Sequence, residues 1–267
     1  MAPKCPMSQK EEPSAKAQLL LSKYEERLGG EVFQRVPEVQ LSADRRIKQL
    51  VSVIEETPIH WEAVFASLQQ YPMYRLGNYG ESDLVGAMLD EHLHLVLSNM
   101  ITSVPWMRDH RISDQDQTEH YRFYPEYLPH HGVFTRAVRT DQGNSIDYSE
   151  YDHLTLTALD EQIKIPTIWE AKMKLMHPDS VHVDKRVCKI FQPEVRKYWL
   201  HPITEFYRTD TLGVVAVTTR NESALESDVV KQFLADGGLL AFVPHTLREY
   251  QEGVKEIFAQ WTHQQYK

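Results

Sequence analysis

The stretch "IPTIWEAKMKLMHPD", residues 165–179, decides the fold because it fits two incompatible local structures. As a strand, it is a run of β-branched, apolar and aromatic residues with Glu170 and Lys172 near its end. As a helix, it leads into the tripeptide at 177–179. A strand places Glu170 and Lys172 on the same face of a sheet, because alternate side chains of a strand point the same way.

The segments that follow and precede this stretch favour the strand. The run "HLTLTA" (153–158) alternates apolar and polar residues at period two, as a half-buried strand does. Two later runs, "LGVVAVTT" (212–219) and "LLAFV" (239–243), are typical of buried strands, and helical patterns at 223–238 and 249–261 follow them. This order of elements predicts an α/β fold, a mixed central sheet flanked by helices.

The first third of the chain has helical periodicity. Apolar residues recur at spacings of three and four in 42–56, 60–70 and 81–101. Residues 102–150 have no such pattern and carry several prolines and aromatics, which indicates irregular structure or short strands. We therefore expect three parts: a loose tail at 1–16, a helical region at 17–80, and an α/β domain at 81–267 that contains an irregular insertion at 102–150.

Composition narrows the classes of function. The net charge of −9 argues against a strongly basic nucleic-acid binder, although residues 164–208 carry nine Lys or Arg against five Asp or Glu. The two cysteines, Cys5 and Cys188, have no spacing typical of a disulfide framework or a zinc site. No apolar run reaches the roughly 20 residues that cross a bilayer, and the polar first 16 residues do not resemble a signal peptide. These features predict an intracellular protein, cytoplasmic or nuclear, with no membrane partner.

Carboxylates near the central strand are candidates for chemistry. Seventeen residues separate Asp152 from Glu170, which is enough for two adjacent antiparallel strands and their turn. Such a hairpin brings the two carboxylates side by side, with Lys172 on the same face as Glu170. Asp147 and Glu150 compete with Asp152 for the role of first carboxylate.

The pattern of Asp152 followed by Glu170-Ala171-Lys172 resembles the PD-(D/E)XK nuclease superfamily. That family has a core of helix, three strands, helix and strand, which can be laid on residues 81–219. The resemblance implies that Asp152 and Glu170 hold a Mg²⁺ ion and that Lys172 orients or activates the attacking water. A leading helix often adds a further carboxylate, for which Glu81 is the first candidate and Glu91 the second. The family's Pro-Asp dipeptide is absent, because Tyr151 precedes Asp152.

The resemblance implies a metal-dependent nuclease that hydrolyses nucleic-acid phosphodiester bonds with Mg²⁺ or Mn²⁺, with DNA favoured over RNA as the partner. Carboxylate oxygens are ligands that Mg²⁺ prefers, and a nearby amine adds positive charge beside the reacting phosphate. Two alternatives stay open: a catalytically inert protein of the nuclease fold, and an interaction protein whose helices at 40–101 hold a partner. A separate alternative to the catalytic interpretation is that Glu170 and Lys172 are solvent-facing strand residues that form a weak ion pair.

A third alternative comes from His177-Pro178-Asp179, which resembles the tripeptide of J-domain co-chaperones. That alignment requires a helix through residues 165–176. It also places Pro193 inside a helix, at a cost of roughly 3 kcal/mol. We therefore expect the tripeptide to form a turn after a strand.

Overall fold

The computed structural model describes residues 37–71, 81–109, 132–136, 147–161, 163–173, 189–207, 209–220 and 225–265. They all belong to one compact unit, Arg35–Lys267. The helices are α2 (Pro37–Glu56), α3 (Trp61–Leu68), α4 (Glu81–Ser103), α5 (Pro193–Tyr207), α6 (Asp228–Ala235) and α7 (Leu247–Gln265), with a short 3₁₀ helix η3 (Lys189–Phe191). The strands are β1 (Met107–Asp109), β2 (Gly132–Arg136), β3 (Asp147–Tyr151), β4 (His153–Ala158), β5 (Lys164–Lys172), β6 (Gly213–Thr219) and β7 (Leu239–Val243).

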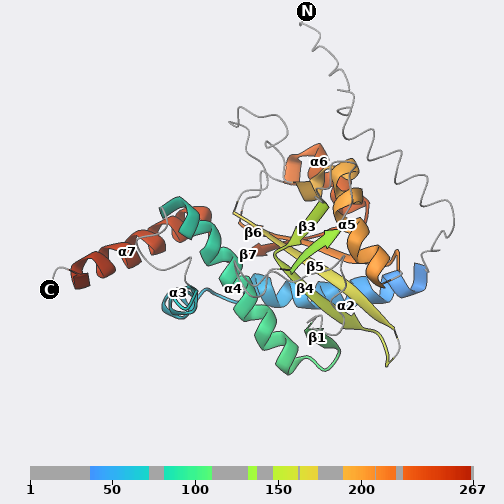
Figure 1. Ribbon diagram of the computed structural model, residues 1–267, viewed down its shortest axis with the longest axis horizontal. Coiled ribbons are helices and arrows are strands. Elements are labelled where there is room, and N and C mark those ends of the chain that lie inside the picture. Colours follow the sequence, from blue (N-terminus) through green and yellow to red (C-terminus); the bar gives the residue numbers. More distant parts are fainter. Residues whose placement is uncertain are drawn as a thin grey trace, which may run out of the picture. The chain divides into compact units, whose positions relative to one another are not determined.

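Five of the strands form one mixed sheet in the order β1-β4-β5-β6-β7 (Figure 1). Strands β1, β4 and β5 are antiparallel neighbours, whereas β5, β6 and β7 run parallel. The two parallel steps are connected through α5 and α6, because parallel neighbours need a crossover connection. The predicted α/β fold with a mixed sheet and flanking helices is therefore confirmed.

The decisive stretch is a strand as far as the structure describes it. Strand β5 occupies Lys164–Lys172, pairs with β4 on one side and β6 on the other, and is buried from Ile165 to Ala171. A helix at these residues, which the J-domain alignment requires, is therefore wrong. The tripeptide at 177–179 lies outside the described residues.

The segment predicted to be an irregular insertion contains regular structure. Strand β1 pairs with β4 at the edge of the main sheet, and β2 pairs with β3 in a separate two-stranded sheet. Short strands with little alternation give no clear period-two signal, so the sequence indicated short strands only as an alternative to irregular structure and did not give their bounds. The predicted tail at 1–16 lies outside the described residues, and of the helical region at 17–80 the structure describes α2 and α3.

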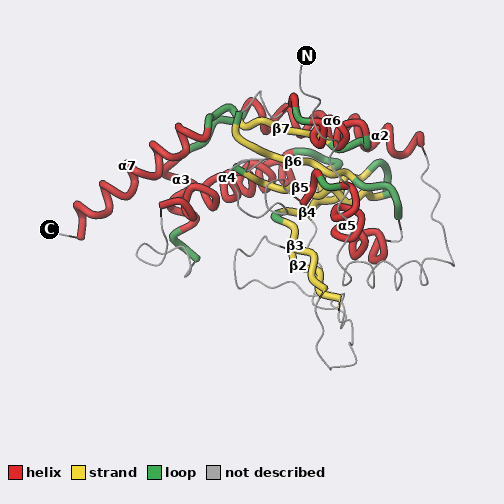
Figure 2. Tube along the Cα trace, turned by 90° about the horizontal axis from the view of Figure 1, so that it is seen from above, coloured by secondary structure: helices red, strands yellow, loops and turns green. Residues whose placement is uncertain are grey.

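Helices lie on both faces of the sheet (Figure 2). Each face has its own apolar core. Trp169 and Val215 project towards α2, α4 and α7, whereas Ile168 and Ala216 project towards α5 and α6. Consecutive residues of one strand thus pack into the two apolar cores on opposite faces of the sheet. Since both faces are covered, a polar side chain at the middle of β5 is buried whichever way it points.

One glycine allows α2 to lie close to the sheet. A Cβ atom added at Gly213, the first residue of β6, would come within 2.4 Å of the Ile47 Cδ1 atom and 2.9 Å of the Thr167 Cγ2 atom. Both are well inside van der Waals contact, so a larger residue would push α2 outward. This close approach lets Ile47 fill the core over β5 and β6.

The packing of α4 predicts a pH dependence of stability. His92 is 3% exposed, and burial lowers the pKa of its imidazole to about 4, with a further lowering by the neighbouring His245 and an opposing hydrogen bond to the Thr57 backbone. In the unfolded chain the pKa is about 6.5. Between these two values the unfolded state binds a proton that the folded state does not. Stability is therefore complete above about pH 6.5 and is lost as pH falls towards 4.

We expect this loss to reach about 3 kcal/mol, an order-of-magnitude figure from the size of the shift. Urea unfolding measured between pH 7.5 and 4.5 checks it, with His92→Leu as the comparison because leucine cannot titrate. The variant should lose less stability over this range than the parent protein. Equal slopes for the two proteins would contradict the prediction.

Candidate active site

Asp152, Glu170 and Lys172 meet at the paired ends of β4 and β5. The ladder pairs His153 with Trp169, so Asp152, one residue before β4, lies opposite Glu170. The Lys172 Nζ atom is 2.8 Å from the Asp152 Oδ2 atom and 3.0 Å from the Glu170 Oε1 atom. The structure thus brings together the three residues that the sequence indicated, with one ammonium between two carboxylates.

The backbone holds the Asp152 carboxylate in place. The N–H of Ala171 donates a hydrogen bond to the Asp152 Oδ2 atom over 2.7 Å, the same oxygen that faces Lys172. Because the donor belongs to the strand that carries Glu170 and Lys172, the bond ties all three side chains to one piece of rigid sheet. Rigid support of this kind is what a preorganised site needs.

Burial distinguishes this cluster from a surface ion pair. The side chain of Glu170 is 1% exposed, that of Asp152 is 10% exposed and that of Lys172 is 36% exposed. The alternative in which Glu170 and Lys172 are a solvent-facing pair is therefore wrong for Glu170. Two carboxylates and one ammonium leave the cluster with a net negative charge in a poorly hydrated place, which is unfavourable unless further groups compensate it.

Hydroxyl groups at the end of β6 fix the chain where it leaves β5. Thr219 donates to the backbone carbonyl of Met173 over 3.0 Å, and Thr218 does so over 3.5 Å. In the parallel ladder Thr218 lies beside Lys172. The sequence pattern indicated only that these threonines end a strand. Their role depends on the parallel pairing of β5 with β6, which sequence periodicity does not reveal.

A second polar contact fixes the start of β4 from the opposite face of the sheet. The His153 Nε2 atom lies 2.9 Å from the Asp90 Oδ1 atom of α4, and both residues are buried. The His94 ring stacks on His153 at 5.7 Å with an interplanar angle of 11°. Asp152 immediately precedes His153 in the chain, so this contact positions its backbone. Asp90 was not a sequence candidate, although an acid within an apolar helix is a signal that could have found it.

The proposed additional carboxylates do not complete a described metal site. Glu81 is the first residue of α4, but its side chain lies outside the described residues. Glu91 is fully buried and accepts a hydrogen bond from the Ser67 hydroxyl of α3 over 2.5 Å, so it takes part in helix packing. Asp147 and Glu150 lie on β3, and their side chains are likewise not described. Over the described residues, no group of three or more His, Cys, Asp or Glu could hold a metal ion.

Comparisons with known proteins add no relative: no protein-family model, no curated protein and no solved structure matches this chain. None of the helices in the described ranges is long and apolar enough to cross a membrane. The geometry of Asp152, Glu170 and Lys172 is therefore the main indication of function.

Proposed function

We propose that this protein is a metal-dependent nuclease that hydrolyses nucleic-acid phosphodiester bonds. The observation that carries the proposal is that Asp152, Glu170 and Lys172 meet at the ends of two paired strands. Both carboxylates lie within 3.0 Å of the Lys172 Nζ atom. With the separate β2–β3 sheet and the short η3 left aside, the elements follow one another as α4, β1, β4, β5, α5, β6, and this order supports the proposal further. It is the order of helix, three strands, helix and strand expected for the PD-(D/E)XK nuclease superfamily.

The donor set suits a hard divalent cation. Asp152 and Glu170 present carboxylate oxygens to the same small space, and such oxygens are preferred by Mg²⁺ and Mn²⁺. These two residues would hold the ion. When bound, it would polarise the phosphodiester and lower the pKa of a bound water.

The chain's own residues supply the remaining chemistry. Lys172 is the partly exposed member of the cluster, so its ammonium can face both the carboxylates and a substrate. There it would stabilise negative charge that develops on the phosphate and orient the attacking water. Asp152 is held in position by the hydrogen bond from the Ala171 N–H.

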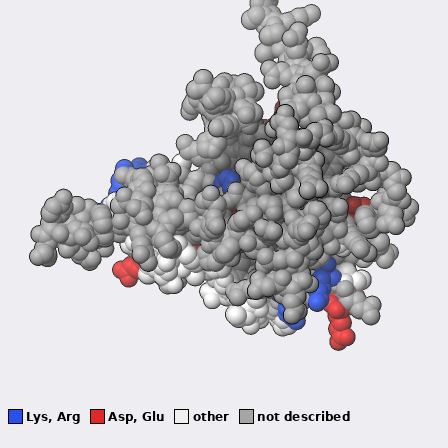
Figure 3. Space-filling model, in the orientation of Figure 1, with Lys and Arg blue, Asp and Glu red and all other residues white. Residues whose placement is uncertain are grey.

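We propose nucleic acid as the substrate because of the cluster of Asp152, Glu170 and Lys172, and not because of a broad basic surface. In the view of Figure 3, the visible Lys and Arg side chains of the described residues form small separate groups. We favour DNA over RNA as the substrate. The proposal places the phosphodiester at the cluster, where the polar groups converge.

One observation favours a second function, a catalytically inert protein of this fold that only binds nucleic acid or protein. Lys172 already neutralises part of the charge of Asp152 and Glu170, and the described residues offer no third metal ligand. A partly compensated cluster that is held by hydrogen bonds can serve as structure alone. The two functions differ in whether a metal ion and cleavage depend on these residues.

A cleavage assay separates the two. The full chain is incubated with single- and double-stranded DNA and RNA, with Mg²⁺, with Mn²⁺ or with a chelator. We expect cleavage that needs the metal and that falls by more than roughly a hundredfold in Glu170→Gln, because that residue would hold the ion and lies against Lys172.

The control is Glu226→Gln, which changes an exposed carboxylate beyond the cluster and should leave the rate unchanged. Cleavage by Glu170→Gln at the parent rate would contradict the proposal. A folded parent protein that cleaves none of the four substrates would favour the inert function.

A further inference from the structure

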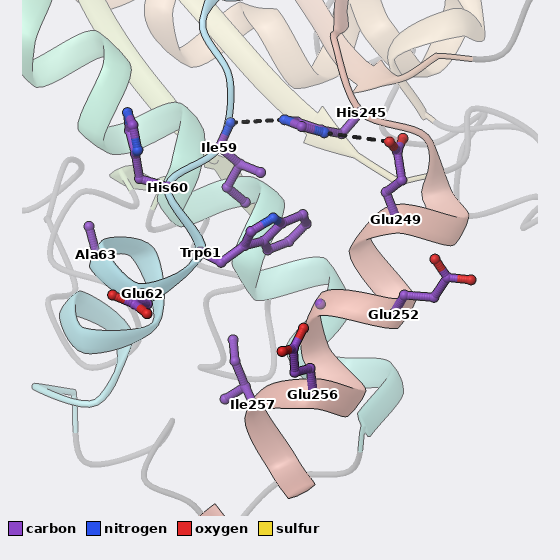
Figure 4. Close-up of a pocket in the computed structure, with 11 residues that line it drawn as sticks. Ile59, His60, Trp61, Glu62, Ala63, His245, Glu249, Glu252, Glu256 and Ile257 are labelled. Carbon is purple, nitrogen blue, oxygen red and sulfur yellow. Dashed lines mark hydrogen bonds and ion pairs between the residues drawn. The ribbon is translucent and has the colours of Figure 1, made fainter. Parts of the chain in front are cut away.

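A groove lies between α3 and α7, away from the cluster of Asp152, Glu170 and Lys172. Its volume is about 770 Å³, and none of those three residues lines it. One wall is the segment 59–63, and the other is formed by His245 and one face of α7 (Figure 4). We call it the α3–α7 groove.

An indole ring forms the centre of the α3–α7 groove. Trp61 is partly buried, with its ring edge-on to Tyr250 at 5.1 Å and tilted against His245 at 5.7 Å. A Cβ atom added at Gly253 would come within 2.9 Å of the indole, so this glycine lets Trp61 lie directly on the backbone of α7. The ring is therefore held in place, and Figure 4 shows it between the two walls.

The two walls are also fixed to each other. The backbone N–H of Ile59 donates to the His245 Nε2 atom over 3.0 Å. The other ring nitrogen of His245 lies 3.9 Å from the Glu249 Oε1 atom. Thr246 donates to Glu249 through its backbone N–H and its hydroxyl, which lowers the pKa of the Glu249 carboxyl and keeps it ionised. The groove thus exists before any partner binds.

The charge of the groove has one sign. Its lining contains Glu62, Glu249, Glu252 and Glu256 and no Lys or Arg. Among the described residues, Glu252 is paired with Arg248 at 2.7 Å, whereas Glu62 and Glu256 have no such ion pair. An acidic wall repels phosphate, so nucleic acid does not belong here. A cation placed on the indole face would meet both the ring quadrupole and the carboxylates.

We propose that the α3–α7 groove binds a basic peptide segment of a partner protein, with one Arg or Lys side chain laid on Trp61. The aliphatic part of that side chain covers the indole, and its charged head lies among Glu62, Glu249 and Glu256. The cavity, the fixed indole and the uniform charge together select this occupant. The inference is independent of the proposed nuclease function.

The test is a fluorescence-anisotropy titration of the full chain with a labelled Arg-Gly-Arg-Gly-Arg peptide. The matched probe is the same peptide with citrulline for arginine, which keeps the shape and removes the charge. We expect the arginine peptide to bind and the citrulline peptide to bind at least roughly tenfold more weakly. Trp61→Leu should weaken the arginine peptide roughly threefold to thirtyfold, the fold-change that corresponds to one cation–π contact.

A second variant keeps the test decisive if Trp61→Leu fails to fold. Glu62→Gln/Glu256→Gln alters two exposed side chains of the groove and should weaken binding by a similar factor. Glu226→Gln/Asp228→Asn removes the same charge from an exposed stretch at α6 and should leave binding unchanged.

Three results would overturn the proposal. The first is no binding of the arginine peptide to the folded parent protein. The second is equal weakening by the groove and the α6 double variants, which would reveal attraction to net charge alone. The third is a dimer of the parent protein that the groove variant dissociates, which would assign the groove to a second copy of the chain.

Discussion

Replacing Lys172 with Met is expected to abolish cleavage and to lower the free energy of unfolding by about 2 to 4 kcal/mol. The range lies slightly below the usual cost of breaking a fully buried ion pair, because the lysine is partly exposed and solvent screens it. Without the ammonium, the carboxylates of Asp152 and Glu170 lose the cation that stands 2.8 and 3.0 Å from them. The cost is large for a partly exposed lysine because Glu170, one of its two partners, is buried.

Urea unfolding followed by circular dichroism measures the stability, and the cleavage assay measures the activity of the same preparation. The double variant Lys172→Met/Glu170→Gln tests the cause, because it removes one of the two charges left behind. It should regain part of the stability while cleavage stays absent. A Lys172→Met protein with parental stability and turnover would show that the amine neither supports the fold nor takes part in the reaction.

The sequence predicted those parts of the fold that local periodicity encodes. Alternation in β4 and continuous apolar runs in β5, β6 and β7 identify strands, and their order with the intervening helices leads to a mixed sheet. The same alternation places Glu170 and Lys172 on one face. The count of seventeen residues back to Asp152 then predicts a pair across a hairpin, which the geometry reproduces.

Features that depend on packing between distant segments could not be predicted. The Asp90–His153 contact joins residues 63 positions apart, and the Ile59–His245 bond joins residues 186 positions apart. No periodicity relates such positions. The same holds for the burial of Glu170, which follows from the covering of both faces of the sheet by helices, and for the groove at Trp61, which needs α3 and α7 side by side.

The second large effect is expected from divalent metal. If Asp152 and Glu170 hold Mg²⁺ or Mn²⁺, the ion binds the folded state and not the unfolded chain, so it stabilises the fold by mass action. At a metal concentration one hundred times the dissociation constant, the gain is about 2.7 kcal/mol. For a domain of this size, that gain raises the melting temperature by roughly 5 to 10 °C. Thermal unfolding with millimolar Mg²⁺, Mn²⁺ or chelator measures this rise before any substrate is known.

Asp152→Asn shows whether the rise comes from the cluster. The amide oxygen can still accept the hydrogen bond from the Ala171 N–H, but the attraction to Lys172 is lost. We therefore expect the metal-free variant to be less stable by about 1 to 2 kcal/mol, since a charge-assisted hydrogen bond becomes a neutral one. Repulsion between the carboxylates alone would predict the opposite sign, but the bridging ammonium offsets that repulsion. Most of the metal-induced rise should disappear in this variant and persist in Glu226→Gln. If neither Mg²⁺ nor Mn²⁺ changes the melting temperature of the parent protein, the cluster has a structural role only. The catalytically inert function would then be the better account of this protein.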